Sequence, residues 1–247
     1  MSSIILQNVS IDFPIYNLNA RSLKKKFLSL ATGGKISTTE NNKVIVKSLN
    51  NISFTLKHGD RIGLIGHNGA GKSTLLKLLA NIYEPTTGHC QIQGRVNPLF
   101  NLMHGIENEF TGFENIVQRG ILLGLTKKQI TLQIEEIAEL SGLGDYLQVP
   151  VRTYSLGMMM RLAFAISTCI QPDILVIDEV FGAGDADFLH KAQKRMTNLL
   201  KKSSIVVLAS HSNDIIKDFC TKVLLLESGN LKFFGDVQAG LDLYCIR

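Results

Sequence analysis

The chain has 247 residues, enough for one large domain or two small ones with a full hydrophobic core. Hydrophobic residues make up 45% and charged residues 19% of the chain, which is typical of a globular protein and excludes a disordered or fibrous one. The net charge of +5 is too small to choose between an anionic membrane surface and nucleic acid as a partner.

The cysteines and the apolar runs indicate the compartment. The four cysteines are widely scattered without metal-type spacing, which favours incidental thiols in a reducing compartment. The first residues lack a basic segment followed by a long apolar stretch, so we expect no signal peptide. No run approaches the roughly 20 apolar residues that span a bilayer. The sequence therefore predicts a cytosolic chain whose role at a membrane, if it has one, comes through a partner.

Apolar residues predict two strands at the start of the chain, from Ile4 to Phe13 and from Val44 to Leu56. A polar insert, residues 14–43, lies between them. Within it, apolar residues recur at helical spacing beside three lysines, namely Leu23, Phe27, Leu30 and Lys24, Lys25, Lys26. This pattern fits either an amphipathic helix at a membrane surface or a helix that packs on its own domain with a solvated lysine face.

A glycine-rich loop follows the next apolar strand, Arg61 to Ile65, and precedes a helical pattern. Its glycines let backbone N–H groups surround phosphates, and the helix N-terminus adds partial positive charge. Lys72 is suited to the outer phosphates, and the Ser73 hydroxyl is suited to Mg²⁺. The strand–loop–helix setting predicts binding of a nucleoside triphosphate. The phosphate loop comprises Gly66, His67, Asn68, Gly69, Ala70, Gly71, Lys72, Ser73 and Thr74.

Residues 99–170 read as mostly helical, with capping-box patterns that begin at Thr111 and Thr126. Near their end, Tyr154-Ser155-Leu156-Gly157-Met158 precedes a clear helical pattern. Ser155 and Gly157 offer a hydroxyl and a bare backbone N–H at a helix N-terminus. This segment is either a second anion site or a capped helix start.

Two continuous apolar runs, Ile174 to Ile177 and Ile205 to Leu208, predict strands buried on both faces, as in a parallel sheet. The first run delivers Asp178 and Glu179 at its carboxyl end, where such sheets place ligands. Asp178 is suited to hold Mg²⁺, and Glu179 to polarise an attacking water. His211 follows the second run and is either a contact of the γ-phosphate or a structural residue. A hairpin over residues 222–235 and a short helix complete the chain.

In this order the motifs resemble those of the ATP-binding subunit of an ABC transporter over nearly the whole chain. The resemblance implies an α/β fold, a P-loop NTPase ABC cassette with a mostly parallel core sheet, an antiparallel β subdomain and an inserted helical subdomain. It implies one nucleotide-binding domain over residues 1–247. The core and β subdomain would take about 1–98 and 171–247, and the helical subdomain about 99–170.

The resemblance also implies a homodimer that closes head to tail over two molecules of ATP with Mg²⁺. The phosphate loop of one subunit would face Ser155 and Gly157 of the other, and Asp185 would communicate across the interface. Phe13 stands where the family places an aromatic ring on adenine, with a core residue at a strand end as the alternative. Hydrolysis would depend on Glu179, His211 and Lys72.

The chain departs from the family pattern at two places. The signature segment, Tyr154–Met158, reads Tyr-Ser-Leu-Gly-Met where Leu-Ser-Gly-Gly-Gln is commoner, and Leu156 is bulkier than glycine. No glutamine stands in the loop that joins the core to the helical subdomain. Asn101 falls near that position, where the family implies a metal or water contact.

Further segments resemble the ATPases of polysaccharide export, namely Thr111–Ile116, Val151–Met158, Asp178–Asp185 and the insert after Phe13. This resemblance implies export of O-antigen, with capsule or teichoic acid as alternatives, through a multi-span membrane permease. The subunit would lie at the cytoplasmic face of the inner membrane, held there by the permease. Because the chain ends at Arg247, we expect no appended carbohydrate-binding domain. A cluster of apolar residues lies near the groove in which the permease is expected to dock, and ordinary core packing explains this cluster equally well. The cluster comprises Leu99, Phe100, Leu102, Met103 and Phe110.

Two other functions compete with transport. A non-transport ABC ATPase acting on nucleic acid or ribosomes usually carries two cassettes or a long coiled-coil insert, and the sequence shows neither, so we expect no specific nucleic-acid partner. A degenerate cassette would bind ATP and hydrolyse it poorly. The sequence disfavours a degenerate cassette, because the residues expected for hydrolysis are present, namely Lys72, Asp178, Glu179 and His211.

Overall fold

The computed structural model describes residues 2–15, 36–38, 44–178 and 186–245. Most of the insert over residues 14–43 lies outside these ranges, as do Glu179 and Asp185. The chain divides into two compact units, Met1–Val96 with Val176–Glu179 and Ser204–Arg247, and Asn97–Leu175 with Val180–Ser203. In the described ranges no helix combines the length and the apolarity that crossing a bilayer requires.

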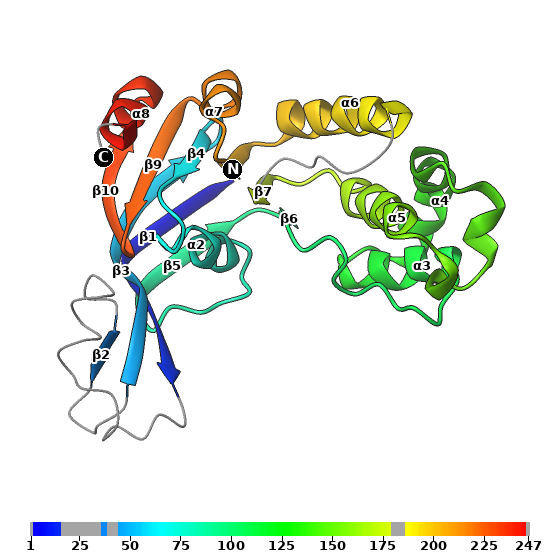
Figure 1. Cartoon of the computed structure of the whole chain (residues 1–247), viewed down its shortest axis with the longest axis horizontal. Coiled ribbons are helices and arrows are strands. Elements are labelled where there is room, and N and C mark those ends of the chain that lie inside the picture. Colours follow the sequence, from blue (N-terminus) through cyan, green and yellow to red (C-terminus); the bar gives the residue numbers. More distant parts are fainter. Residues whose placement is uncertain (1, 16–35, 39–43, 179–185, 246–247) are drawn as a thin grey trace. The chain divides into compact units, whose positions relative to one another are not determined.

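The first unit contains an antiparallel sheet with the strand order β2-β3-β1-β5 (Figure 1). Its two long strands pair with Ile4 opposite Leu56 and Leu6 opposite Phe54, and all four side chains are buried. This alternation of buried and outward residues confirms the two strands predicted at the start of the chain. The strands are β1 (Ser3–Ile15), β2 (Ile36–Thr38), β3 (Val44–Lys57) and β5 (Thr87–Gln93).

A second sheet has the strand order β10-β9-β4-β8-β7-β6. In it β4 runs parallel to both β8 and β9, while β10 returns antiparallel to β9. Residues of β8 are buried throughout, which explains why that strand reads as a continuous apolar run. The strands are β4 (Arg61–Ile65), β6 (Val96–Leu99), β7 (Ile174–Asp178), β8 (Ile205–Ala209), β9 (Lys222–Glu227) and β10 (Asn230–Gly235).

In its described residues, the first unit contains the helices α2 (Lys72–Leu79), α7 (Asn213–Phe219) and α8 (Val237–Cys245). Helix α7 packs on β4 at Gly63, where an added Cβ would lie 2.8 Å from Ile216. The small residue in the strand therefore sets the close approach of this helix to the sheet.

The second unit is mainly helical (Figure 1). Both predicted capping boxes are present, because the Thr111 and Thr126 side chains accept from the backbone N–H groups of Glu114 and Gln129, whose side chains bond back. Its elements are α3 (Gly112–Leu122), α4 (Lys127–Ser141), the short 3-10 turns η1 (Gly144–Gln148) and η2 (Val151–Thr153), α5 (Leu156–Thr168) and α6 (Ala186–Lys202). The unit thus holds α6 in addition to the helices of residues 99–170.

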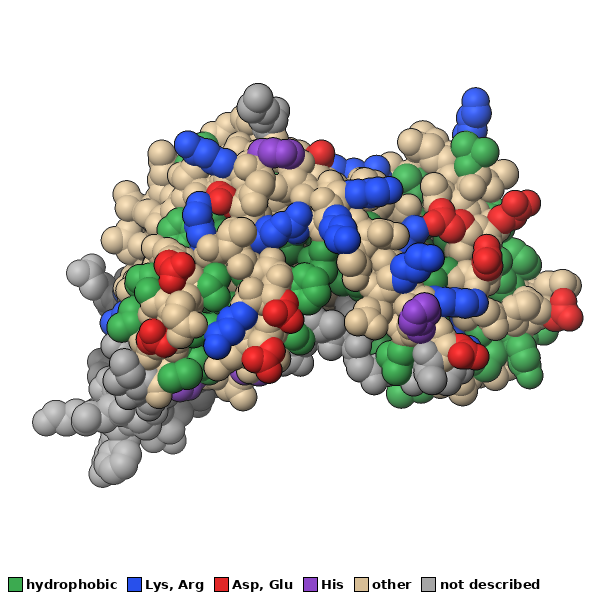
Figure 2. All heavy atoms as spheres, turned by 90° about the horizontal axis from the view of Figure 1, so that it is seen from above, with side chains coloured by type: hydrophobic (Ala, Val, Ile, Leu, Met, Phe, Trp, Pro, Cys, Tyr) green, Lys and Arg blue, Asp and Glu red, His purple; other side chains and the backbone are tan. Residues whose placement is uncertain are grey.

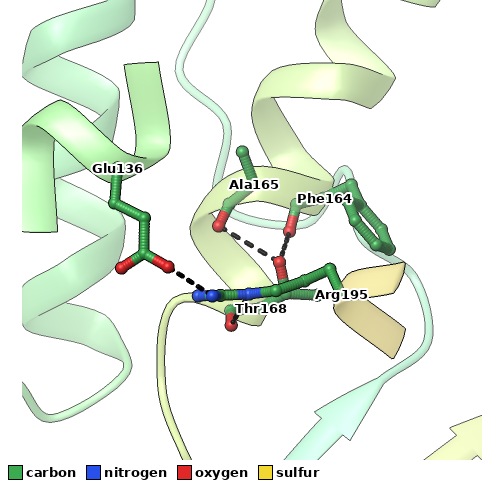
Figure 3. A network of polar contacts seen from close by, with 5 residues as sticks. All are labelled: Glu136, Phe164, Ala165, Thr168 and Arg195. Atoms are coloured by element: carbon green, nitrogen blue, oxygen red, sulfur yellow. Dashed lines mark hydrogen bonds and ion pairs between the residues drawn. The ribbon is translucent and has the colours of Figure 1, made fainter. Parts of the chain in front are cut away.

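Arg195 of α6 ties three helices of this unit together (Figure 3). Its Nε donates to the carbonyl oxygen of Thr168 at 3.0 Å, at the end of α5, and its Nη1 pairs with Glu136 of α4. A cation at the last carbonyls of a helix complements the helix dipole. Because the Arg195 side chain is mostly buried, this pair is better shielded than a surface salt bridge.

Asn115 clamps the loop that leads into α3. Its side chain is fully buried; Oδ1 accepts from the N–H of Glu107 at 2.8 Å. Its Nδ2 donates to the carbonyl oxygens of Glu107, Phe110 and Thr111 at 2.9, 3.3 and 3.0 Å. One side chain therefore holds both ends of the loop over residues 107–111.

We expect Asn115→Ala to destabilise the chain by about 2–4 kcal/mol, because it removes the hydrogen bonds of a fully buried side chain and takes away the acceptor of the Glu107 N–H. Urea unfolding followed by circular dichroism measures this change. The matched control is Asn108→Ala, a change at an exposed residue of the same loop, which should cost no more than about 0.5 kcal/mol. Equal stabilities of the two variants would contradict the clamp.

Candidate nucleotide-binding site

The phosphate loop connects β4 to α2, and glycine is required at two of its positions. Gly66 has φ 147° and Gly71 has φ 111°. A Cβ at Gly66 would lie 2.3 Å from the carbonyl oxygen of Leu226 in β9, and one at Gly71 would lie 2.8 Å from that of Ser48 in β3. The backbone approach leaves no space for a side chain, so the loop conformation depends on these glycines.

Lys72 places a positive charge against the inside of the loop. Its Nζ donates to the carbonyl oxygens of Gly66 at 2.5 Å and His67 at 3.2 Å. The first turn of α2 begins at this residue and contains no acidic side chain. A lysine, the N-terminus of a helix and a curled glycine loop together form a site for a phosphate chain.

Ser73 and Asp178 lie together in the first unit. The Ser73 hydroxyl donates to Asp178 Oδ2 at 3.3 Å. Hydroxyl and carboxylate oxygens are the ligands that Mg²⁺ prefers, and Mg²⁺ usually takes only one or two protein ligands beside phosphate oxygens. Within the described ranges, no group of three or more His, Cys, Asp or Glu residues is arranged to hold a metal ion. The pair therefore fits a nucleotide-bound Mg²⁺.

His211 follows β8, which lies between β4 and β7 in the sheet. Three adjacent strands therefore lead to candidate site residues: the phosphate loop follows β4, His211 follows β8, and Asp178 is the last residue of β7. Two hydrogen bonds fix the segment around the exposed histidine: Ser210 Oγ accepts from the N–H of Ser212 at 3.1 Å, and Ser212 Oγ accepts from that of Ile215 at 3.5 Å. The role of His211 at a γ-phosphate stays a prediction.

Phe13 is half-buried on β1 and packs edge-on against Tyr83, with ring centroids 5.3 Å apart. The Lys77 ammonium lies 5.5 Å from the centre of the Tyr83 ring. The place of Tyr83 beside Phe13 could not be predicted from the sequence, because a single aromatic residue in the turn after a helix follows no periodic pattern. Stacking of Phe13 on adenine stays a prediction.

The signature segment begins α5 in the second unit. Ser155 is the N-cap, and its Oγ accepts from the N–H of Met158 at 3.2 Å, so a capped helix start is present. Leu156 is 68% exposed. In the described ranges, an added Cβ at Gly157 would have only Ser155 Oγ within 4 Å, at 3.9 Å. The helix N-terminus is thus open to an incoming anion.

Tyr154 anchors this segment. Its Oη donates to the carbonyl oxygen of Tyr146 at 2.5 Å, and the two rings pack edge to face. Burial raises the pKa of the Tyr154 phenol above its usual value. The hydroxyl therefore remains a donor at neutral pH and fixes the residue that precedes Ser155.

Asn101 lies in the second unit with a φ of 52°. With Leu102, Met103, His104 and Met160 it lines a cavity of about 560 Å³. Leu102 is buried, as is Leu99, whereas Phe110 is 40% exposed, so the predicted apolar cluster is partly core. The metal or water contact of Asn101 stays a prediction, and the roles of Glu179 and Asp185 fall on residues that lie outside the described ranges.

We expect Lys72→Ala to lower the affinity for MgATP by at least about tenfold, because a charge-assisted hydrogen bond to phosphate is lost. Calorimetric titration of the full chain measures the dissociation constant. Lys232→Ala removes an equal charge from an exposed position on β10 and should bind like the wild type. Tight binding by Lys72→Ala would contradict the phosphate-loop assignment.

The chain is similar to known proteins over most of its length. A family model described as ABC transporter matches residues 49–182. The chain is 47% identical over 229 residues to the O-antigen export system ATP-binding protein RfbE of Yersinia enterocolitica, covering 93% of this chain and 96% of that protein. It is 37% identical over 236 residues to the teichoic acids export ATP-binding protein TagH of Bacillus cereus, covering 96% of this chain but only 41% of that protein.

Among solved structures, a dimeric ATP-binding cassette in a post-hydrolysis state with ADP and phosphate matches with a TM-score of 0.68. The match covers 95% of this chain and 98% of that one at 17% identity. This likeness confirms the predicted α/β cassette fold. Together with the family model and the near full-length relative, it leads to one conclusion: the chain belongs to the ABC transporter family.

Proposed function

We propose that this chain is the ATP-hydrolysing subunit of a bacterial ABC transporter that exports a polysaccharide, with an O-antigen chain as the leading substrate. The observation that carries this proposal is the 47% identity to RfbE over nearly the whole of both chains. The site supports it, because Lys72, Ser73 and Asp178 meet the needs of a nucleotide with its metal ion. The likeness to TagH makes teichoic acid the second candidate, and capsule export is a third.

Each site residue has a distinct role in the hydrolysis of ATP. Lys72 and the N–H groups of the loop bind the outer phosphates. Ser73 and Asp178 would hold Mg²⁺, which would neutralise charge on the phosphate oxygens. Glu179 accepts a proton as the water oxygen attacks the γ-phosphorus, and His211 orients that water. The bond between the γ-phosphorus and the bridging oxygen breaks, and ADP and phosphate leave.

A homodimer completes each site. Ser155 and Gly157 of one subunit face the γ-phosphate held by the other, which is supported by the open N-terminus of α5. The exposed Leu156 side chain then lies at this interface, and Asp185 links the two sites across it.

A separate multi-span permease holds the dimer at the cytoplasmic face of the inner membrane. The second unit, which carries the signature segment, transmits closure of the dimer to that permease. A nucleic-acid partner has less support: on the face seen in Figure 2, Asp and Glu side chains flank the Lys and Arg side chains, and the net charge of +5 is small for a protein that binds a phosphate backbone.

We expect Glu179→Gln to bind ATP and remain a closed dimer, with hydrolysis reduced by about 10²-fold or more, because the proton acceptor is lost while the binding groups stay. Size-exclusion chromatography in MgATP and phosphate release measure both effects. Glu84→Gln makes the same chemical change at an exposed residue of the first unit and should turn over normally. Normal turnover by Glu179→Gln would remove Glu179 as the base.

In a bacterium that depends on this chain, replacement of the wild type by Asp178→Ala should stop the appearance of polysaccharide at the cell surface while the glycan accumulates inside. Loss of the carboxylate removes a metal ligand and so the energy source of export. Immunostaining of intact and permeabilised cells measures the two pools. Undiminished surface polysaccharide of every class would contradict the proposed function.

A further inference from the structure

The last helix of the chain is held firmly in the first unit. Helix α8 packs on β9 and β10 and against α7. Its closest approach is at Gly240, where an added Cβ would lie 2.0 Å from Cγ2 of Val223 in β9, and the neighbouring Leu241 is buried. The glycine and the leucine together fix the helix on the sheet, and so they fix where its last turn lies.

That last turn contacts two segments of the nucleotide site. The ring of Tyr244 lies against the ring of His67 in the phosphate loop, with centroids 5.2 Å apart and planes inclined by 45°. The next residue, Cys245, accepts a weak hydrogen bond at its Sγ from Asn213 Nδ2 at 3.9 Å. Asn213 begins α7, two residues after His211. Consecutive residues of α8 thus touch the loop that binds phosphate and the segment that carries His211.

His67 is the point at which this contact acts on the loop. Its side chain is exposed to solvent, whereas its carbonyl oxygen accepts from Lys72 Nζ at 3.2 Å and from the N–H of Ala70 at 3.0 Å. A ring held against the half-buried Tyr244 restrains the backbone of its own residue. The restraint extends to the carbonyl oxygen that positions the lysine.

We propose that Tyr244 is a positioning residue for the phosphate loop, which it holds through His67 in the conformation that binds the phosphates of a nucleotide. The inference rests on the proposed nucleotide site and adds the end of α8 to it. An aromatic pair contributes enough to change a binding constant by about two- to tenfold. Because the ring and not the hydroxyl makes the contact, phenylalanine should replace tyrosine without loss.

Calorimetric titration of the full chain with MgADP, which is not turned over, tests this. Tyr244→Ala should raise the dissociation constant by about two- to tenfold, and Tyr244→Phe should restore the wild-type value. Leu243→Ala is the matched control, because it shortens an adjacent, exposed side chain of the same helix. It should bind like the wild type, whereas a general loosening of α8 would weaken binding in both alanine variants and overturn the proposal.

A double-mutant cycle locates the contact. In a His67→Ala background, Tyr244→Ala should have little further effect on the dissociation constant, since the ring partner is already gone. An effect of Tyr244→Ala that persists in full in this background overturns the proposal, as does wild-type binding by Tyr244→Ala alone. Lys72→Ala, measured in parallel, distinguishes a failure of the proposed nucleotide site from a failure of the inference about Tyr244. If Lys72→Ala abolishes MgADP binding while Tyr244→Ala leaves MgADP binding unchanged, only the role of Tyr244 fails.

Discussion

The nucleotide site depends on one backbone arrangement, the close packing of the phosphate loop against the turn between β9 and β10. The N–H of Gly229 in that turn donates to the carbonyl oxygen of Ala70 at 2.8 Å, and the carbonyl oxygen of Gly229 accepts from the N–H of Asn50 at 2.8 Å. The turn therefore connects the loop to β3 of the antiparallel sheet. At Gly66 the same packing brings the loop so close to Leu226 that only glycine fits. Strands of both sheets thus support one loop.

The charges of the site follow from this support. Strands of the parallel sheet end at a common edge, so Ser73 and Asp178 meet although they are far apart in the sequence. Lys72 donates to carbonyl oxygens of the loop, and in the proposed site a negatively charged phosphate would be a stronger acceptor for the same ammonium group. In the second unit, Tyr154 and Ser155 organise a separate helix N-terminus with similar chemistry. Each unit therefore has one helix N-terminus suited to an anion, as the proposed reaction between two subunits requires.

Features encoded locally could be predicted from the sequence. The strand–loop–helix order around residues 66–74, both capping boxes and the apolar strands each depend on residues within a few positions of one another, and each is present as predicted. Contacts between distant segments could not be predicted. Two ring pairs depend on how β1 and α8 pack, and no pattern of spacing in the sequence predicts them. These are Phe13–Tyr83 and His67–Tyr244. Strand β2, which falls in the polar insert, exists because Ile36 pairs with Val46 of β3. Asn115 belongs to the segment Thr111–Ile116, which resembles the polysaccharide exporters, but its clamp depends on how the loop over residues 107–111 folds back onto it.

The proposed function requires this chain to use ATP on behalf of a membrane partner. Purification of the chain from native membranes in mild detergent, followed by identification of the accompanying proteins and assay of ATP hydrolysis, tests it most directly. We expect a multi-span membrane protein in equal amount and hydrolysis that depends on its presence. A chain that hydrolyses ATP alone and is accompanied by RNA or ribosomes instead would contradict the proposed function.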